Sequence, residues 1–425
     1  MDNILYKKEL DILKLKCRSH KLQDFRTIIM TLYDSIDTSK ITISKKKIKL
    51  KVNNRCLFDI VIHLYNNKQL NIKSPQLINI LETKKYDMLK EYINNGLAYT
   101  LIDDVNELYN NNMIPNNILY RHVNKYIINT FVECNIIDYI LNSIHSKYEY
   151  SIKYKNITIN LCIYGKQIKN KELHDILTRI ILIGLYKSTS ELLTINIELY
   201  MTPYKKNINN YIKSNSSVIG PRETNSGFSI SDKLLCVYRS EELNKVLVHE
   251  LIHYLELDLG SIKFKDVSNH FNINPNTKFI RINEAYTEIL GIIINTIINS
   301  HNIHNTFEIM DYELTYSCYQ VAKILHLFKF ETAYDFFYNE YDGKNKFKQN
   351  TSIFSYFILK SAIMYNLDDF LEKYLNNSLT KYNFTAFILE QCSTEFINII
   401  NDYMTYIKMN KKSNIYYTLR MTCYK

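Results

Sequence analysis

Apolar residues recur at helical spacing through the first third of the chain. This spacing covers residues 22–36, and the segment 74–96 begins with Ser-Pro and ends at Gly, which are common helix start and stop signals. Residues 114–144 predict one long helix or two shorter ones. We therefore expect a mostly helical N-terminal region over residues 1–148.

The pattern changes to alternating apolar and polar residues in the second third. Residues 150–166 alternate and are rich in β-branched and aromatic side chains, which predicts a strand or a hairpin. A helix over 171–188, a strand over 192–202 and one or two strands over 228–239 are expected next. The segment 240–260 begins with Ser-Glu-Glu and ends at Gly, so it predicts a further helix.

The remainder of the chain is predicted to be helical. Its clearest helical segments are 282–300, 307–328, 351–366 and 384–407. The whole pattern predicts an α+β fold in three parts: the N-terminal helical region, a central region with strands over 149–300, and a helical C-terminal region over 301–425.

The composition bounds the size of the core. The chain has 425 residues of which 46% are hydrophobic, enough for a large core and for two or three domains. Eight Gly and five Pro argue against long flexible linkers. Asn, Ile, Lys and Tyr are abundant and Trp is absent, a usage typical of AT-rich genomes such as those of some large DNA viruses.

The formal charge of +10 is spread along the chain. Its densest basic run, residues 44–51, alternates with apolar residues, so an exposed strand is the first interpretation and a nucleic-acid patch the second. No recognisable nucleic-acid module accompanies this run. A nucleic-acid partner is therefore not expected, and nothing in the sequence indicates an oligomeric state.

The cysteines and the apolar segments indicate the cellular compartment of the protein. The eight cysteines form no CxxC pair, and the N-terminus lacks the apolar core of a signal peptide. Both observations predict an intracellular protein, located in the cytoplasm, which could be that of a host cell, or in a virion. The longest apolar stretch, 289–298, is too short to span a bilayer and contains Asn295. No membrane span is expected.

The segment 246–258, VLVHELIHYLELD, carries two histidines four residues apart. On a helix, His249 and His253 share one face and can offer ring nitrogens to a single zinc ion. Glu250 projects beside them and can take a proton from a metal-bound water, which is the chemistry of the HExxH pattern. The alternative is a buried helix that contains two core or surface histidines. The apolar flanks favour a helix that packs on a sheet and turns one edge to a cleft.

A second acidic motif, NEAYTE, begins 30 residues after His253. Glu284 and Glu288 lie four apart on one face of a mostly apolar predicted helix, and buried carboxylates are costly unless they are paired or bind a metal. Both carboxylates would be satisfied if one of them bound zinc and the other held a zinc-binding histidine in place. The alternative is an ordinary acidic first turn, which the helix dipole favours.

These two motifs together resemble the gluzincin metallopeptidases, the thermolysin-like group, over roughly residues 150–300. The resemblance implies a zincin-like catalytic region, with a twisted mixed sheet before the active-site helix. It implies that His249, His253 and Glu284 bind Zn²⁺, that Glu250 is the general base, and that Glu288 orients a histidine. The family usually has Asp at the position of Glu288, and its two motifs lie closer together.

The resemblance also implies a substrate-binding edge strand and a donor for the oxyanion. The segment NSGFSIS resembles the family's edge strand, with Asn225, Gly227 and Phe228 expected to bind the substrate backbone; a plain hairpin is the alternative. The family uses Tyr or His to stabilise the oxyanion, and Tyr316 is the first choice here. Tyr319 and His270 are alternatives.

The sequence therefore predicts a zinc metallopeptidase that acts on a polypeptide substrate, with the C-terminal helices completing the cleft. A structural or interaction protein on a zincin scaffold that has lost hydrolysis is the alternative. A basic nucleic-acid-associated protein is a third and weaker hypothesis.

Overall fold

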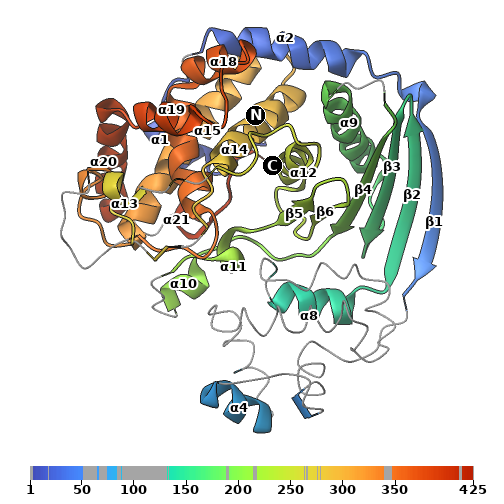
Figure 1. Ribbon diagram of the computed structural model, residues 1–425, viewed down its shortest axis with the longest axis horizontal. Coiled ribbons are helices and arrows are strands. Elements are labelled where there is room, and N and C mark those ends of the chain that lie inside the picture. The colour runs from blue at the N-terminus through green and yellow to red at the C-terminus, as the bar shows by residue number, and fades with distance from the viewer. Residues whose placement is uncertain are drawn as a thin grey trace.

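The computed structural model has one open sheet on one side and a group of C-terminal helices on the other (Figure 1). It describes residues 3–17, 19–50, 65–66, 74–83, 88, 132, 134–187, 191–213, 218–262, 264, 267–274, 276–277, 279–338, 347–410 and 414–424. The fold is α+β, as the sequence predicts. None of the helices in these ranges combines the length and the apolar character that crossing a bilayer requires.

The sheet has six strands in the order β1-β2-β3-β4-β6-β5. Their bounds are β1 (Thr42–Lys49), β2 (Ser146–Tyr154), β3 (Ile157–Tyr164), β4 (Leu193–Tyr200), β5 (Gly227–Ile230) and β6 (Leu234–Val237). The first three strands are antiparallel, β3, β4 and β6 run parallel, and β5 returns antiparallel to β6. The sheet is thus mixed, and β5 is the strand at one of its edges.

Strict alternation explains why one face of the sheet is covered. Ile159, Leu161, Ile195 and Ile197 are buried, and the residues between them in β3 and β4 are more exposed. The helices α9 (Asn170–Lys187) and α12 (Leu243–Tyr254) pack against each other, and α12 also packs on β5 and β6. A right-handed crossover through α9 is the usual way to join the parallel strands β3 and β4.

The C-terminal helices form a second packed group around α14 and α15. They are α14 (Asn283–Asn299), α15 (Ile303–Leu327), α16 (Tyr334–Phe337), a π-helical segment (Phe354–Leu359), α17 (Lys360–Tyr365), α18 (Leu367–Leu375), α19 (Phe384–Gln391) and α20 (Thr394–Met409). The helix α2 (Lys21–Asp34) runs along the top of Figure 1 and contacts α9, α14 and α18. It therefore bridges the sheet side and the helical side.

The remaining described helices are short or peripheral. They are α1 (Lys7–Leu13), a 3₁₀ turn (Thr38–Lys40), α4 (Pro75–Glu82), α8 (Cys134–Ser143), α10 (Asn209–Lys213), α11 (Pro221–Thr224), α13 (Val267–His270) and α21 (Asn414–Tyr417). The two ends of the chain meet, since Ile4 and Tyr424 form an antiparallel bridge (Figure 1).

Most predicted elements are confirmed, with two corrections. The helix expected over 240–260 is shorter and runs from Leu243 to Tyr254. It begins late because Glu242 has a left-handed backbone (φ 60°) and its carboxylate pairs with Lys206. The segment 384–407 is two helices, since Ser393 caps the second one. Of the helix expected over 74–96, the described part is α4 (Pro75–Glu82), and most of residues 84–96 lie outside the described residues. The first part of the segment 114–144 also lies outside them.

The sheet also extends into the region predicted to be helical. Its β1 comes from that N-terminal region and pairs along its whole length with β2. The predicted boundary at residues 148 and 149 falls within β2. Residues 44–49 of the basic run lie in this exposed strand, which was the first of its two interpretations.

Candidate metal centre

Two antiparallel helices bring the two motifs of the sequence together. Toward the C-terminal end of α12, His253 faces Glu284 in the first turn of α14. Four residues earlier in α12 and four later in α14, His249 faces Glu288. Gly291, one turn further along α14, lies against His249.

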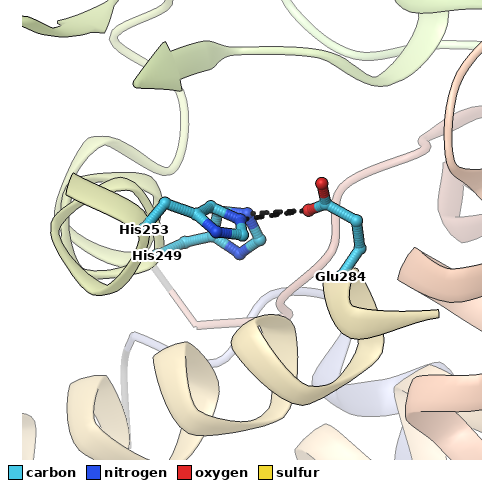
Figure 2. A group of neighbouring side chains, drawn as sticks. All are labelled: His249, His253 and Glu284. Atoms are coloured by element: carbon cyan, nitrogen blue, oxygen red, sulfur yellow. Dashed lines mark hydrogen bonds and ion pairs between the residues drawn. The ribbon is translucent and has the colours of Figure 1, made fainter. Parts of the chain in front are cut away.

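The side chains of His249, His253 and Glu284 converge on one point (Figure 2). The Nε2 atoms of His249 and His253 lie 3.5 Å and 3.2 Å from the same carboxylate oxygen of Glu284. One potential ligand atom from each residue lies within 4.8 Å of the other two. This spacing, in a mostly buried setting, could hold one metal ion.

A carboxylate lies behind each histidine ring. The Nδ1 atom of His249 is 2.9 Å from a carboxylate oxygen of Glu288, and the Nδ1 atom of His253 is in contact with Asp258. Lys245 forms a buried ion pair with Glu288. Such partners fix the orientation of ligating histidines and leave Nε2 to face the metal. Glu288 thus lies beside His249.

Asp258 is not predicted as a site residue from the sequence, although it stands only five residues after His253. Its spacing carries no helical signal, because α12 ends at Tyr254 and the chain turns back toward the histidine. The other oxygen of Asp258 accepts a hydrogen bond of 2.9 Å from the backbone of Gly260, which holds that turn.

The charges of the group oppose the effect of burial. Burial alone would raise the pKa of Glu284 and lower the pKa of His253, but the opposite charges face each other and outweigh it. The pKa of Glu284 is therefore held far below its ordinary value and that of His253 well above. Burial would likewise raise the pKa of Glu288, but the neighbouring Lys245 and His249 lower it. Both glutamates are thus ionised and favour a bound cation.

Glu250 lies beside the three potential ligands but is not one of them. Its side chain is buried and lines a cavity of about 550 Å³ that also reaches His249, His253 and Glu284. Burial raises the pKa of the Glu250 carboxyl, although the two histidines act in the opposite direction. A carboxylate with a raised pKa is suited to accept and return a proton near neutral pH.

The edge strand β5 forms part of the same cavity. Asn225, Gly227 and Phe228 all line it, so the structure brings these three predicted residues to the site. Gly227 is required there, because a Cβ atom would lie 2.8 Å from the backbone oxygen of Cys236 and 3.1 Å from the Cγ of Glu250. The Asn225 side chain accepts a hydrogen bond of 2.8 Å from Thr351.

The structure does not bring Tyr316 to the site, which corrects the prediction. Its ring is fully buried, it stacks on Tyr6, and its hydroxyl donates to the carbonyl of Arg420. The alternatives fail as well: Tyr319 is fully buried in α15, and His270 is exposed and stacks on Phe264. The amphipathic register of α15 points its tyrosines into the helical core.

A different tyrosine occupies the position that was expected of Tyr316. Tyr356, in the π-helical segment, lines the cavity, and its ring centre lies 6.1 Å from that of His249. Burial, with the charges of Glu284 and Glu250, raises the pKa of its hydroxyl well above the ordinary value, so the hydroxyl keeps its proton. No local pattern distinguishes this residue among the 36 tyrosines of the chain.

Comparison with known proteins gives one relationship. No protein-family model matches the chain, and no solved structure matches it. The chain is similar to an uncharacterized protein of Acanthamoeba polyphaga mimivirus, with 29% identity over 204 residues. The similarity covers 44% of this chain and 51% of the mimivirus protein, so it spans about half the length of that relative. It assigns no activity.

Proposed function

We propose that this protein is a zinc-dependent metallopeptidase of the gluzincin type, with a zincin-like catalytic region. One observation carries the proposal: two histidines and a glutamate converge within 4.8 Å on one side of a cavity, and Glu250 lies beside them without joining them. Three protein ligands and one open position are the usual arrangement of catalytic zinc. A structural zinc site would use four protein ligands and would have no need of Glu250.

His249, His253 and Glu284 would hold the zinc. When bound there, zinc polarises a carbonyl group and lowers the pKa of a water molecule. Glu250 accepts the proton of the attacking water and returns it to the leaving amine, for which its raised pKa is suited. Tyr356 donates a hydrogen bond to the oxygen on which negative charge develops. Glu288 and Asp258 keep the two imidazole rings in place.

A polypeptide substrate would lie along β5. This strand is at the edge of the sheet and lines the cavity, so an extended peptide can add to it by backbone hydrogen bonds. Because strand addition uses the backbone, it accepts many sequences. Selectivity then depends on the side chains around the cavity.

The decisive experiment compares two variants with the wild-type protein. We expect about one zinc per wild-type chain. Glu250→Gln should keep the metal and lose peptide hydrolysis, because the amide cannot take a proton. His253→Ala should lose both metal and hydrolysis. Metal content is measured by elemental analysis and hydrolysis with a broad peptide library, with and without a chelator. A wild-type protein that binds no zinc would refute the proposal.

An inactive zincin scaffold is the competing function. That alternative was favoured by Glu in place of Asp at position 288 and by the absence of an evident oxyanion donor. The carboxylate of Glu288 lies 2.9 Å from His249, and Tyr356 lines the cavity. Neither feature therefore argues for lost hydrolysis, and the peptide-library digest separates the two functions. An intracellular, virus-encoded enzyme remains part of the proposal, since the similar protein is from a mimivirus.

A further inference from the structure

The cavity contains one cationic side chain that has no role in the proposed catalysis. Arg281 lines the cavity, and, within the described part of the chain, it is the only lysine or arginine that does so. The described residues provide no hydrogen bond or ion pair for its guanidinium group, although the cavity also contains Asp258, Glu250 and Glu284. An arginine presents a planar fork of donors that matches a carboxylate.

The backbone around Arg281 is well fixed. The carbonyl of Arg281 accepts a hydrogen bond of 3.2 Å from the backbone of Glu284, in the first turn of α14. Its own amide donates to the carbonyl of Phe279, which also accepts 3.0 Å from the Gln349 side chain. Arg281 is therefore attached to the same rigid element as the metal ligand Glu284, three residues away.

The position of Arg281 along the cleft follows from the directions in which β5 and α14 run relative to α12. Gly227, at the start of β5, lies against Val246 and Glu250, whereas Ser231, just after β5, donates 2.7 Å to Glu256. The strand thus runs in the same direction as α12.

The helix α14 runs in the opposite direction to α12. Glu288 pairs with Lys245, and Glu284 pairs with His253, about two turns further along α12. Arg281 precedes Glu284, so it lies further toward the Asp258 and Ser231 end of the cleft.

The direction of a bound peptide decides which of its residues lie near Arg281. Antiparallel pairing is somewhat more stable per residue than parallel pairing, so a substrate should run antiparallel to β5. Its N-terminal residues then lie near Ser231 and its C-terminal residues near Gly227. Building on the proposed function, we propose that Arg281 selects substrates with an acidic side chain on the N-terminal side of the scissile bond.

Paired peptides test this selection. One internally quenched peptide carries Glu at the three positions before the scissile bond, and its partner carries Gln there. The wild-type protein should cleave the Glu peptide about tenfold more efficiently, measured as kcat/KM, since a charge-assisted pair contributes roughly that factor. Arg281→Gln should remove the preference and leave cleavage of the Gln peptide unchanged. Arg281→Glu should prefer a Lys peptide.

Two controls separate local recognition from other effects. Lys233→Gln removes the same charge from an exposed residue near the cleft that does not line the cavity, and it should keep the preference. Each peptide is also made with a free and with an amidated C-terminus. Dependence on the free C-terminus instead of on the Glu residues would overturn the inference, because Arg281 would then bind the terminal carboxylate of a peptide in the parallel direction.

A binding measurement distinguishes failure of this inference from failure of the proposed function. Fluorescence anisotropy records binding of the Glu and Gln peptides to zinc-loaded Glu250→Gln protein, which needs no turnover. If the wild-type protein cleaves nothing but the Glu peptide binds about tenfold tighter in an Arg281-dependent way, the peptidase proposal fails and only the recognition of acidic peptides by Arg281 stands. Equal binding of both peptides refutes the inference whether or not hydrolysis occurs.

Discussion

Each histidine of the candidate metal group has a carboxylate beside it that is itself held in place. Glu288 is fully buried and pairs with Lys245, and Asp258 accepts the backbone hydrogen bond of Gly260. Both rings are therefore oriented by residues that need not move when an ion binds. Such preorganisation keeps Nε2 of each ring directed toward Glu284 (Figure 2).

At the residue scale, Tyr356→Phe tests the proposed oxyanion donor. The change removes one hydroxyl and keeps the ring against His249, so metal content and KM should stay the same. We expect kcat to fall about 100-fold, the usual effect of losing one such donor. Steady-state kinetics measure it, and Tyr382→Phe, at an 85% exposed residue, is the matched control. An unchanged kcat would remove Tyr356 from the mechanism.

The pH dependence of metal binding is a second test at this scale. Burial would lower the pKa of His249 and His253, but their carboxylate partners raise both above the ordinary value. Since a metal binds only the neutral imidazole, protons compete with it already above the ordinary pKa of about 6.5. Zinc affinity should therefore rise with pH through the neutral range, and each histidine should release a proton on binding.

Competition with a chromophoric chelator between about pH 6 and pH 8 measures this dependence around the ordinary histidine pKa. Asp258→Asn is the matched variant, because the charge of Glu284 and the hydrogen bond to the Asp258 carboxylate both raise the pKa of His253, and this variant removes the second cause while keeping the metal ligand. Its affinity curve should shift to lower pH. A wild-type affinity that does not change over this range would contradict the prediction.

At the scale of elements, the contact between β5 and α12 depends on Gly227. A Cβ atom there would collide with the backbone oxygen of Cys236, so Gly227→Ala must displace β5 from β6 or from Glu250. We expect a loss of about 1–3 kcal/mol in the free energy of unfolding and a large loss of activity. Urea unfolding and peptide turnover are the measurements.

Gly291→Ala is the control for that substitution. Its Cβ atom would lie 3.5 Å from the Cβ of His249, an ordinary contact, and alanine favours a helix interior. Unfolding free energy and activity should be equal to or above those of the wild-type protein. Equal behaviour of the two variants would show that Gly227 is not required for close packing.

Elements with a strong local period could be predicted, and those set by distant contacts could not. β3 and β4 alternate, and α14 is apolar on nearly all sides, so each element carries its own signal. The start of α12 was predicted too early, because Glu241 and Glu242 look like an acidic first turn. In the fold, the Glu242 carboxylate pairs with Lys206 and that of Glu241 lies 3.3 Å from Arg420.

The same reasoning applies to the site. His249, His253 and Glu284 are marked by spacing on helices, which a sequence displays directly. Tyr356 lies 72 positions after Glu284, in a π-helical segment between helices, and only the packed fold brings it to the cavity. Selection of Tyr316 failed because position along the chain does not show that α15 packs away from the cavity, which no residue of this helix lines.

At the scale of the whole molecule, the last residues of the chain pack behind the candidate metal centre. The backbone amides of Met421 and Thr422 donate to Glu242 at 2.8 Å and 2.9 Å. Glu313 accepts from the amide of Tyr424 and from the hydroxyl of Thr422. The Met421 sulfur lies 3.7 Å from the ammonium group of Lys245, the residue that pairs with Glu288.

Removing residues 418–425 should therefore damage both the fold and the metal site. Glu242 and Glu313 would lose these donors, each at a cost of roughly 1–3 kcal/mol, and the buried side chains of Leu419 and Cys423 would be lost as well. The sum is a large share of the ~5–15 kcal/mol that stabilises a typical domain.

Thr422→Val is the graded control, because it removes one hydroxyl and keeps every backbone donor, so it should cost only about 1–2 kcal/mol. Thermal unfolding and zinc affinity are measured for all three proteins. A truncated chain with the melting temperature and zinc affinity of the full chain would mean that the tail only covers the surface and that the metal centre is supported by α12 and α14 alone.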